Sequence, residues 1–342
     1  MTGLTSELPR IGIRLSGGLE PRRCVELAKV AETADLASVW FAENPFQRGV
    51  LATAGACAAA TSRVRIGIGV VNPFSRHPSL IAMEFSALAE LAAGRITLGL
   101  GSGVGEAMRR IGYGHHRPVT AVREAVGIIR AMLAGDKVTH RGHVFSVFRA
   151  QLGHRSPEVP IYMAAAGERG LKACGEIGDG LIVSNLTPPR STARMAAILG
   201  AAAARVGRPL PGIVQYVPCA VRTDGAAARA VVKAAIGAML TRFWPDGNDW
   251  PAAKEAIVSE SGIPRSHFAA VLAWLRRGED AATLLDDGFV EAFAIAGTAQ
   301  ECLRKAERYR AAGADELALT FAGAQPEEDI AYLGSALSRV EP

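Results

Sequence analysis

The sequence lacks the features that mark several classes of protein. Its 342 residues include five cysteines, which are widely dispersed and form no C-x-x-C pair. This excludes a small disulfide scaffold and predicts buried thiols in a reducing compartment. No segment approaches the roughly 18 apolar residues that span a bilayer. The first ten residues lack a basic region followed by an apolar stretch, so we expect a cytoplasmic protein without signal peptide or membrane partner.

A strong excess of charge of one sign is also missing. The 38 Lys and Arg against 33 Asp and Glu give a net charge of +5. These residues are scattered without a block of like sign, so we expect no nucleic-acid partner. A mild positive field still suits an anionic small molecule. Because 49% of the residues are apolar, the chain can bury the core of one large α/β barrel or of two ordinary domains.

Strand-like and helix-like segments alternate along the chain. The near-continuous apolar runs predict strands that are covered on both faces, and helices between them indicate a parallel sheet. The predicted strands span residues 10–15, 38–41, 64–71, 95–100, 160–164, 180–184, 213–221 and 316–320. Eight such strands predict an α/β fold, a (β/α)₈ TIM barrel over residues 1–342. A doubly wound sheet is the alternative, and the late return of the last strand favours closure.

Two segments interrupt this alternation. Residues 136–157 predict a hairpin and loop, with strands at 138–140 and 144–145. Residues 241–293 predict a longer helical insertion that contains Pro and Trp. Insertions into a barrel usually line or cap its active face, so we expect both to contribute to the pocket.

The ends of the second and third predicted strands carry residues that suit chemistry. Glu43 and Asn44 follow the second strand and would either act on a reacting ring or form a turn before a proline. At the end of the third strand, the glycine at Gly69 allows a ligand to approach the backbone of Gly69 and Val70. Arg76 and His77 come next, and they either serve a ligand or cap the following helix.

Small residues follow two further strands. Gly101, Ser102 and Gly103 lie between a strand and a helix, where backbone N–H groups hold a phosphate or a planar ring. Their spacing matches neither a P-loop nor a dinucleotide fingerprint. The residues Ala165 to Gly167 precede another helix and would let an anion approach its first amides, or would form a tight turn without a ligand.

Two other chemistries find little support. His115 and His116 are adjacent and would diverge on any regular element, and no acidic partner with ligand spacing accompanies them, so we predict no metal site. A Gly-x-Ser-x-Gly elbow is missing, which argues against a serine hydrolase.

Taken in order, several stretches carry a family resemblance. They are residues 38–43, 71–78, 94–103, 164–180, 284–290 and 294–298, the last followed by Glu-Cys-Leu. Through them the chain resembles the luciferase-like flavin and deazaflavin oxidoreductases, in particular the methylenetetrahydromethanopterin reductase-like, F420-dependent branch. The resemblance implies a (β/α)₈ barrel with the cofactor ring at the carboxyl ends of the strands, often in a homodimer.

The resemblance also implies roles for individual residues. A bulge with a non-prolyl cis peptide at Gly69–Val70 would face the cofactor ring. The segment Gly101, Ser102 and Gly103 would flank that ring, and Ala165, Ala166 and Gly167 would take the phosphate of the ribityl chain. Glu43 would donate a proton or position the ring. Its neighbour Asn44, together with Asn72, would hydrogen-bond the cofactor or substrate.

The chain departs from the family pattern at two places. Glu43 and Asn44 stand where many relatives carry Asp-His or a similar pair, and Arg14 stands where methanopterin-type relatives tend to carry an acidic residue. We predict hydride transfer between coenzyme F420 and a small organic substrate, with a separate flavin or F420 reductase as a further partner. The alternatives are a two-component monooxygenase that uses reduced FMN and dioxygen, and a flavin-binding protein without catalysis.

Overall fold

Eight parallel strands close into a barrel in the computed structural model, which describes residues 8–44, 46–92, 94–103, 105–113, 117–245, 247 and 250–339. The barrel strands are β1 (Arg10–Ser16), β2 (Ser38–Ala42), β3 (Arg65–Val71), β4 (Ile96–Leu100), β7 (Ile161–Ala164), β8 (Gly180–Val183), β9 (Gly212–Val221) and β11 (Glu316–Phe321). Their order is β9-β11-β1-β2-β3-β4-β7-β8, and a β8–β9 pairing closes the ring. The predicted (β/α)₈ barrel is confirmed, and all eight predicted strands belong to it.

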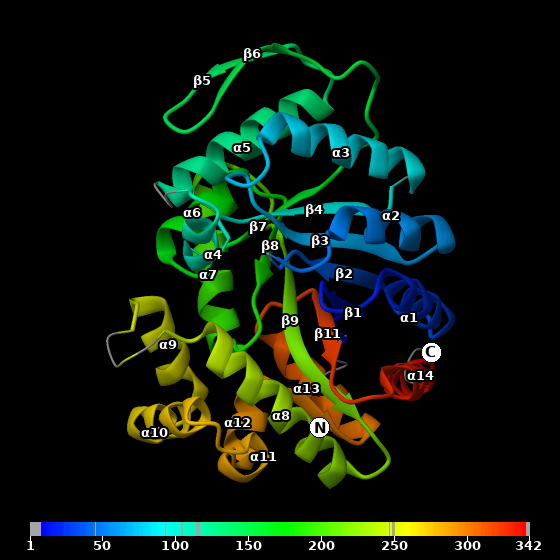
Figure 1. The fold of residues 1–342 in the computed structure, drawn as a ribbon, viewed down its shortest axis with the longest axis vertical. Helices are drawn as coiled ribbons and strands as arrows, with labels where there is room; N and C mark the ends of the chain where they lie inside the picture. Colours follow the sequence, from blue (N-terminus) through cyan, green and yellow to red (C-terminus); the bar gives the residue numbers. More distant parts are fainter. Residues whose placement is uncertain are drawn as a thin grey trace.

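Helices surround the barrel, as Figure 1 shows. They are α1 (Pro21–Thr33), α2 (Val50–Ala60), α3 (Pro78–Leu91), α4 (Gly105–Arg110), α5 (Pro118–Leu133), α6 (Glu168–Ile177), α7 (Pro189–Arg205), α8 (Gly225–Phe243), α13 (Ala299–Ala311) and α14 (Pro326–Leu337). Five of them begin with a proline, whose fixed φ and missing N–H suit the first turn of a helix. The short strand β10 (Ile295–Gly297) pairs with the end of β9 and was not predicted.

The first interruption contains a hairpin of β5 (Val138–Arg141) and β6 (Ser146–Ala150), beyond α3 and α5 at the top of Figure 1. Its second strand begins later than the predicted residues 144–145. The carboxylate of Glu124 accepts the backbone N–H groups of residues 143–145, at 2.7 to 3.1 Å. These donors are therefore not available to a β-ladder.

The second interruption contains four helices, α9 (Ala252–Ser261), α10 (Arg265–Arg276), α11 (Ala281–Leu284) and α12 (Asp287–Phe293). They lie with α8 at the opposite end of the molecule from the hairpin (Figure 1). A separate apolar core holds them together, in which Phe268 packs against Trp244, Trp250 and Phe289 at centroid distances of 4.8 to 5.6 Å.

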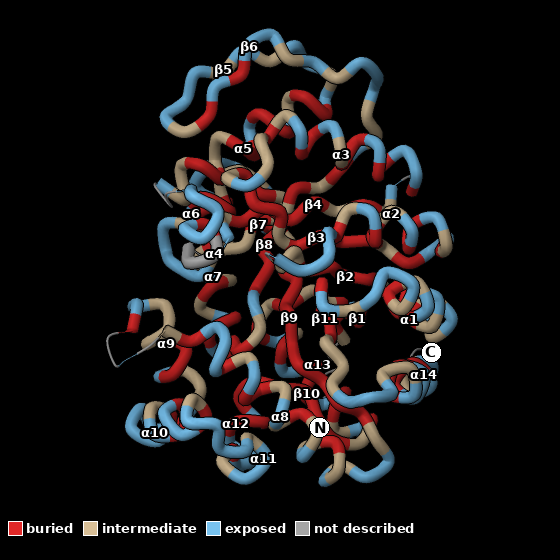
Figure 2. Tube along the Cα trace, viewed as in Figure 1, coloured by how far each residue is buried: buried red, intermediate tan, exposed pale blue. Residues whose placement is uncertain are grey.

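Aromatic side chains fill the barrel itself, whose strands are among the most buried parts of the chain (Figure 2). Trp40 from β2 lies 6.0 Å from both Tyr162 and Tyr216, measured between ring centroids. The neighbouring strands make room for these rings with glycines. A Cβ at Gly67 would come within 2.4 Å of the Trp40 ring, so no larger residue fits there.

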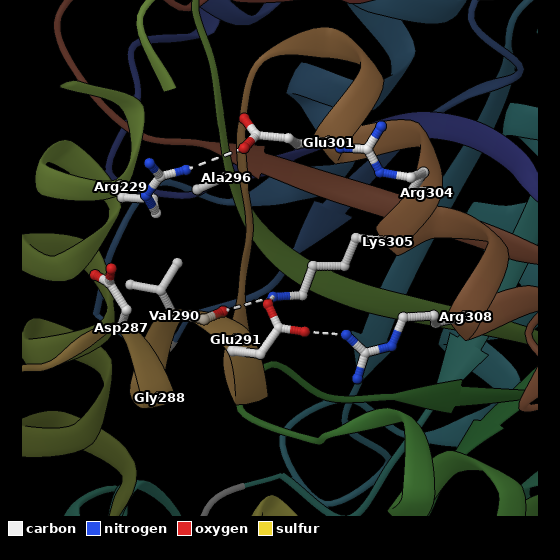
Figure 3. Close-up of a pocket in the computed structure, with 10 residues that line it drawn as sticks. All are labelled: Arg229, Asp287, Gly288, Val290, Glu291, Ala296, Glu301, Arg304, Lys305 and Arg308. Atoms are coloured by element: carbon white, nitrogen blue, oxygen red, sulfur yellow. Dashed lines mark hydrogen bonds and ion pairs between the residues drawn. The ribbon is translucent and has the colours of Figure 1, made fainter. Parts of the chain in front are cut away.

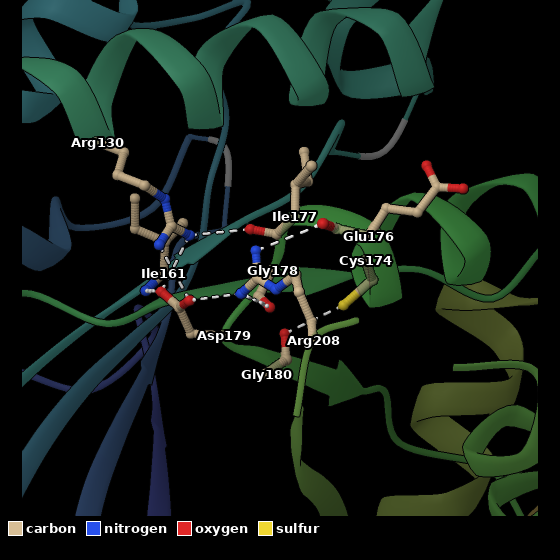
Figure 4. Close-up of polar contacts among 9 residues, drawn as sticks. All are labelled: Arg130, Ile161, Cys174, Glu176, Ile177, Gly178, Asp179, Gly180 and Arg208. Atoms are coloured by element: carbon tan, nitrogen blue, oxygen red, sulfur yellow. Dashed lines mark hydrogen bonds and ion pairs between the residues drawn. The ribbon is translucent and has the colours of Figure 1, made fainter. Parts of the chain in front are cut away.

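Two carboxylates, partly buried Asp179 and buried Glu316, tie the amino ends of the strands together. Asp179 accepts hydrogen bonds from Arg130 and Arg208 at 3.1 Å and from the Ile161 N–H at 2.9 Å (Figure 4). Glu316 does the same at the start of β11, where it accepts the indole N–H of Trp40 at 2.7 Å. These networks serve stability, because barrel enzymes place their chemistry at the opposite face.

Candidate active site

The carboxyl ends of the barrel strands, here called the barrel mouth, bring two predicted residues into contact. Glu43 follows β2, and Arg76 follows β3 with its backbone N–H bonded to the Asn72 carbonyl. The Arg76 guanidinium donates to the Glu43 carboxylate at 3.2 Å. Both side chains are partly buried, at 18% and 29% exposure, so the pair fixes the carboxylate while leaving it accessible. Asn44, also partly buried, starts the turn that follows.

The end of β3 has the geometry that the resemblance implies. The peptide bond between Gly69 and Val70 is cis, and the ladder with β4 shifts register between Gly69 and Val71. From the other side of the barrel, the Tyr216 hydroxyl donates a buried hydrogen bond to the Gly69 carbonyl at 3.2 Å. The Val70 side chain lies against Gly101, where an added Cβ would come within 2.9 Å of it.

Asn72 joins the loops that follow β3 and β4. Its amide donates to the Ser102 carbonyl at 3.1 Å and accepts from the Phe74 N–H at 2.8 Å. Gly103 has a φ of +71°, and a Cβ there would lie 2.2 Å from the Asn72 amide nitrogen. The structure therefore gives Asn72 a positioning role, whereas its contact with a cofactor stays a prediction.

His77 takes the helix-capping role that the sequence left open. Its ring nitrogen Nδ1 accepts the Ser79 N–H at 3.2 Å and so caps α3. The ring meets Phe145 of the hairpin edge-on, with centroids 5.8 Å apart. Of the two neighbours, Arg76 reaches Glu43, whereas His77 caps α3 and packs its ring against Phe145.

A cavity of about 370 Å³ opens where β7 meets α6. Its lining includes Ser102 and the small residues Ala164 to Gly167, with apolar side chains of α5 on the other side. The first N–H groups of α6 have no partner within the helix and carry partial positive charge. At Gly167 an added Cβ would meet nothing within 4 Å, so the space before the helix is open. This arrangement suits an anionic group on an apolar-walled ligand.

Three residues of the barrel mouth escaped the sequence analysis as ligand candidates. The Asn185 side chain, just beyond β8, has a buried carbonyl oxygen without a hydrogen-bond partner among the described residues. Arg14 and Tyr216 meet inside the barrel, with the guanidinium carbon 4.9 Å from the ring centroid. The alternation of inward-facing residues along β1 and β9 is the signal that points to the latter two.

A larger cavity, of about 820 Å³, lies outside the barrel between α8, α12 and α13 (Figure 3). Its charges largely satisfy one another. Lys305 donates to the Val290 carbonyl at 2.9 Å and to Glu291 at 3.0 Å, and Arg229 pairs with Glu301 at 3.4 Å. Burial lowers the pKa of Lys305 to about 7. We do not place the active site here, because the cavity lacks the strand-end residues of the mouth.

The described part of the chain has neither a metal-binding cluster nor a membrane-spanning helix. No cluster of three or more His, Cys, Asp or Glu side chains there is placed to hold a metal. The pair His115 and His116 lies outside the described residues. Nor does any described helix combine the length and the apolar character needed to cross a membrane.

Comparison with known families identifies which of the families that share this barrel fold the chain belongs to. Residues 1–316 match the family of luciferase-like monooxygenases. The chain belongs to this family. The matched residues run from before β1 to the first residue of β11, so the match covers nearly the whole barrel.

Individual relatives of this luciferase-like chain include F420-dependent enzymes. A 5,10-methylenetetrahydromethanopterin reductase of Methanolobus tindarius is 29% identical over 283 residues, which cover 80% of this chain and 82% of the relative. An F420-dependent glucose-6-phosphate dehydrogenase of Beutenbergia cavernae is 35% identical over 193 residues, 52% of this chain and 56% of the relative.

A solved structure shows the same fold. The coenzyme F420-dependent tetrahydromethanopterin reductase from Methanopyrus kandleri superimposes with a TM-score of 0.85 at 23% identity, over 98% of this chain and 100% of that one.

Proposed function

We propose that this luciferase-like chain is an oxidoreductase that transfers a hydride between coenzyme F420 and a small organic substrate at the barrel mouth. The observation that carries the proposal is the cavity at the β7–α6 turn, which continues to Ser102 and so joins two of the predicted cofactor segments. Supporting it, relatives from several organisms are named F420-dependent or are reductases of the same branch.

The residues present fit such a cofactor. A planar ring needs a surface without protruding side chains, and Gly101 and Gly103 supply one beside Val70. A phosphate on the connecting chain needs donors without bulk, which Ala165, Ala166 and Gly167 provide at the start of α6. The buried amide oxygen of Asn185, which has no hydrogen-bond partner among the described residues, would supply one more polar contact in the mouth.

The chain's own residues would then bind and orient the cofactor and substrate and move a proton. When bound, F420 supplies the ring carbon that gives or accepts the hydride. Glu43 would hold or donate a proton, since its carboxylate lies at the mouth and remains partly exposed. Arg76 would orient it through their ion pair, and Asn44 would add a hydrogen bond to substrate or cofactor.

We also propose a homodimer in the cytoplasm. Helix α3 exposes Leu80, Met83 and Leu91 on its outer side, each about half accessible to solvent. Apolar exposure of this kind is typical of a surface that another protein covers. The five cysteines are all buried and form no disulfide, as expected in a reducing compartment. A separate reductase would restore the cofactor after each turnover.

Turnover assays test the proposed reaction. Oxidised F420 is mixed with a panel of alcohols, and reduced F420 with C=C, C=N and C=O acceptors, while the deazaflavin absorbance is followed. We expect turnover with one class of substrate. Glu43→Gln should lower kcat by about 10²- to 10⁴-fold, as for loss of a general acid, and leave F420 affinity unchanged. The matched control is Glu26→Gln, an exposed carboxylate on α1.

Other results would overturn parts of the proposal. Unchanged turnover in Glu43→Gln removes Glu43 from the chemistry. Binding of F420 without turnover of any compound in the panel favours a binding protein without catalysis.

A further inference from the structure

Arg14 is a cation inside the barrel mouth that the protein itself leaves largely unpaired. Among the described residues, its one hydrogen-bond partner is the Thr320 hydroxyl, which the Nη1 group reaches at 3.3 Å. The Nε–H is buried and has no partner at all. No ion pair joins the guanidinium to a carboxylate of the described residues, and its burial is not offset by an opposite charge. A guanidinium carries five N–H donors, so most of its capacity is unused.

The surroundings of Arg14 do not supply the missing charge. Its register partner on β2 is Trp40, and its guanidinium stacks over the ring of Tyr216. Burial lowers the pKa of Arg14, and of the neighbours only Tyr216 counteracts it. A buried cation without an anion is unfavourable unless a ligand brings one.

The position of Arg14 connects it with the proposed cofactor site. The Tyr216 hydroxyl donates to the Gly69 carbonyl, so one aromatic residue separates Arg14 from the irregular end of β3. Arg14 itself comes from β1, on a different side of the barrel from the predicted cofactor segments of β4 and β7. With Ser16 and Thr320 it also lines a cavity of about 230 Å³ that extends from the ends of β1 and β11 to the helices α1 and α14.

We propose that the substrate is an organic carboxylate and that Arg14 binds its carboxylate group. The inference rests on the proposed function for the reacting ring, but its binding step does not require that the ring be F420. One planar guanidinium matches one carboxylate through two parallel N–H···O bonds. A phosphate would need more positive charge. The nearest further cation of this cavity, Arg23, is already paired with Glu26 and with Glu327.

Binding of a carboxylate and of its neutral isostere tests this assignment. The purified protein is titrated calorimetrically with benzoate, benzamide and inorganic phosphate, in the presence and absence of F420. Arg14→Met removes the charge and keeps the length. The matched control, Arg22→Met, removes an exposed charge on α1 that has no ion pair within the described residues.

We expect wild type and Arg22→Met to bind benzoate and to discriminate against benzamide. Arg14→Met should bind benzoate about 10- to 100-fold more weakly, as for loss of a charge-assisted pair. It should fold, because an apolar chain replaces a buried unpaired cation. Arg14→Lys, which keeps the charge without the fork, should retain part of the affinity and serves if Arg14→Met does not fold.

Three results would overturn the proposal. They are equal benzoate affinity in wild type and Arg14→Met, no preference for benzoate over benzamide in either state of the protein, and tighter binding of phosphate than of benzoate. The F420 titration of the same samples tests the proposed function separately. If wild type binds no F420, the proposed function fails, while the benzoate measurements on the cofactor-free protein still decide the role of Arg14.

Discussion

The hydrogen bond from Tyr216 to the Gly69 carbonyl allows a prediction whose size follows from the structure. Both groups are buried, and Tyr216→Phe removes the hydroxyl while keeping the ring. The loss of one buried hydrogen bond should lower the free energy of unfolding by about 1–2 kcal/mol. At about 2.1 cal/mol/K per residue, 342 residues lose about 1.4 °C of Tm per kcal/mol, so Tm should fall by about 1–3 °C.

The same substitution should weaken cofactor binding, because the carbonyl belongs to the end of β3, against which the ring would lie. We expect the Kd for F420 to rise about tenfold, which is 1.4 kcal/mol. Fluorescence titration measures the Kd, and calorimetry measures Tm. The control is Tyr309→Phe, a buried tyrosine whose hydroxyl makes no hydrogen bond to the described residues. A lowered Tm with an unchanged Kd would refute the link between Tyr216 and cofactor binding at the end of β3.

Three further predictions concern local structure. Although burial alone would raise it, three backbone N–H donors lower the pKa of Glu32 to about 2. Its unfolded pKa is about 4.3, so ionised Glu32 stabilises the fold above that pH and loses this effect as the pH falls toward 2. Glu32→Gln should therefore have a lower Tm than wild type at pH 7 and the same Tm near pH 2. A Tm difference that persists in acid contradicts this. Gly103→Ala should lower both Tm and F420 affinity, because its Cβ would collide with Asn72, and wild-type values in both assays would show that the loop adapts. Burial raises the pKa of Cys57 and of Cys174 to about 12, so a thiol reagent should label all five cysteines only after denaturation, and rapid labelling of the native chain would be inconsistent with the buried thiols.

The barrel could be predicted from the sequence because its strands have a simple physical signature. Each is buried on both faces, which produces continuous apolar runs such as those at 64–71 and 213–221. Strand β10 has no such signature, since Ile295–Gly297 is too short and pairs only with the end of β9. The start of β6 shifted because a distant side chain, that of Glu124, competes for the backbone donors.

The sequence predicts where the candidate site lies better than it predicts the contacts within the site. Strand ends place Glu43 and Arg76 at one face, but their ion pair depends on the packing of two loops. For His77 the neighbouring residues decide the role, since Ser79 offers the N–H that it caps. The contact between Arg14 and Tyr216 joins strands about 200 residues apart, and only the closed barrel brings them together.

The central claim is that the barrel mouth binds coenzyme F420, and equilibrium binding tests it most directly. The purified protein is titrated with F420 and with FMN, each oxidised and reduced, and followed by fluorescence or absorbance. We predict micromolar or tighter binding of F420 and much weaker binding of FMN. A preference for reduced FMN would contradict the claim and assign the chain to the two-component monooxygenases instead.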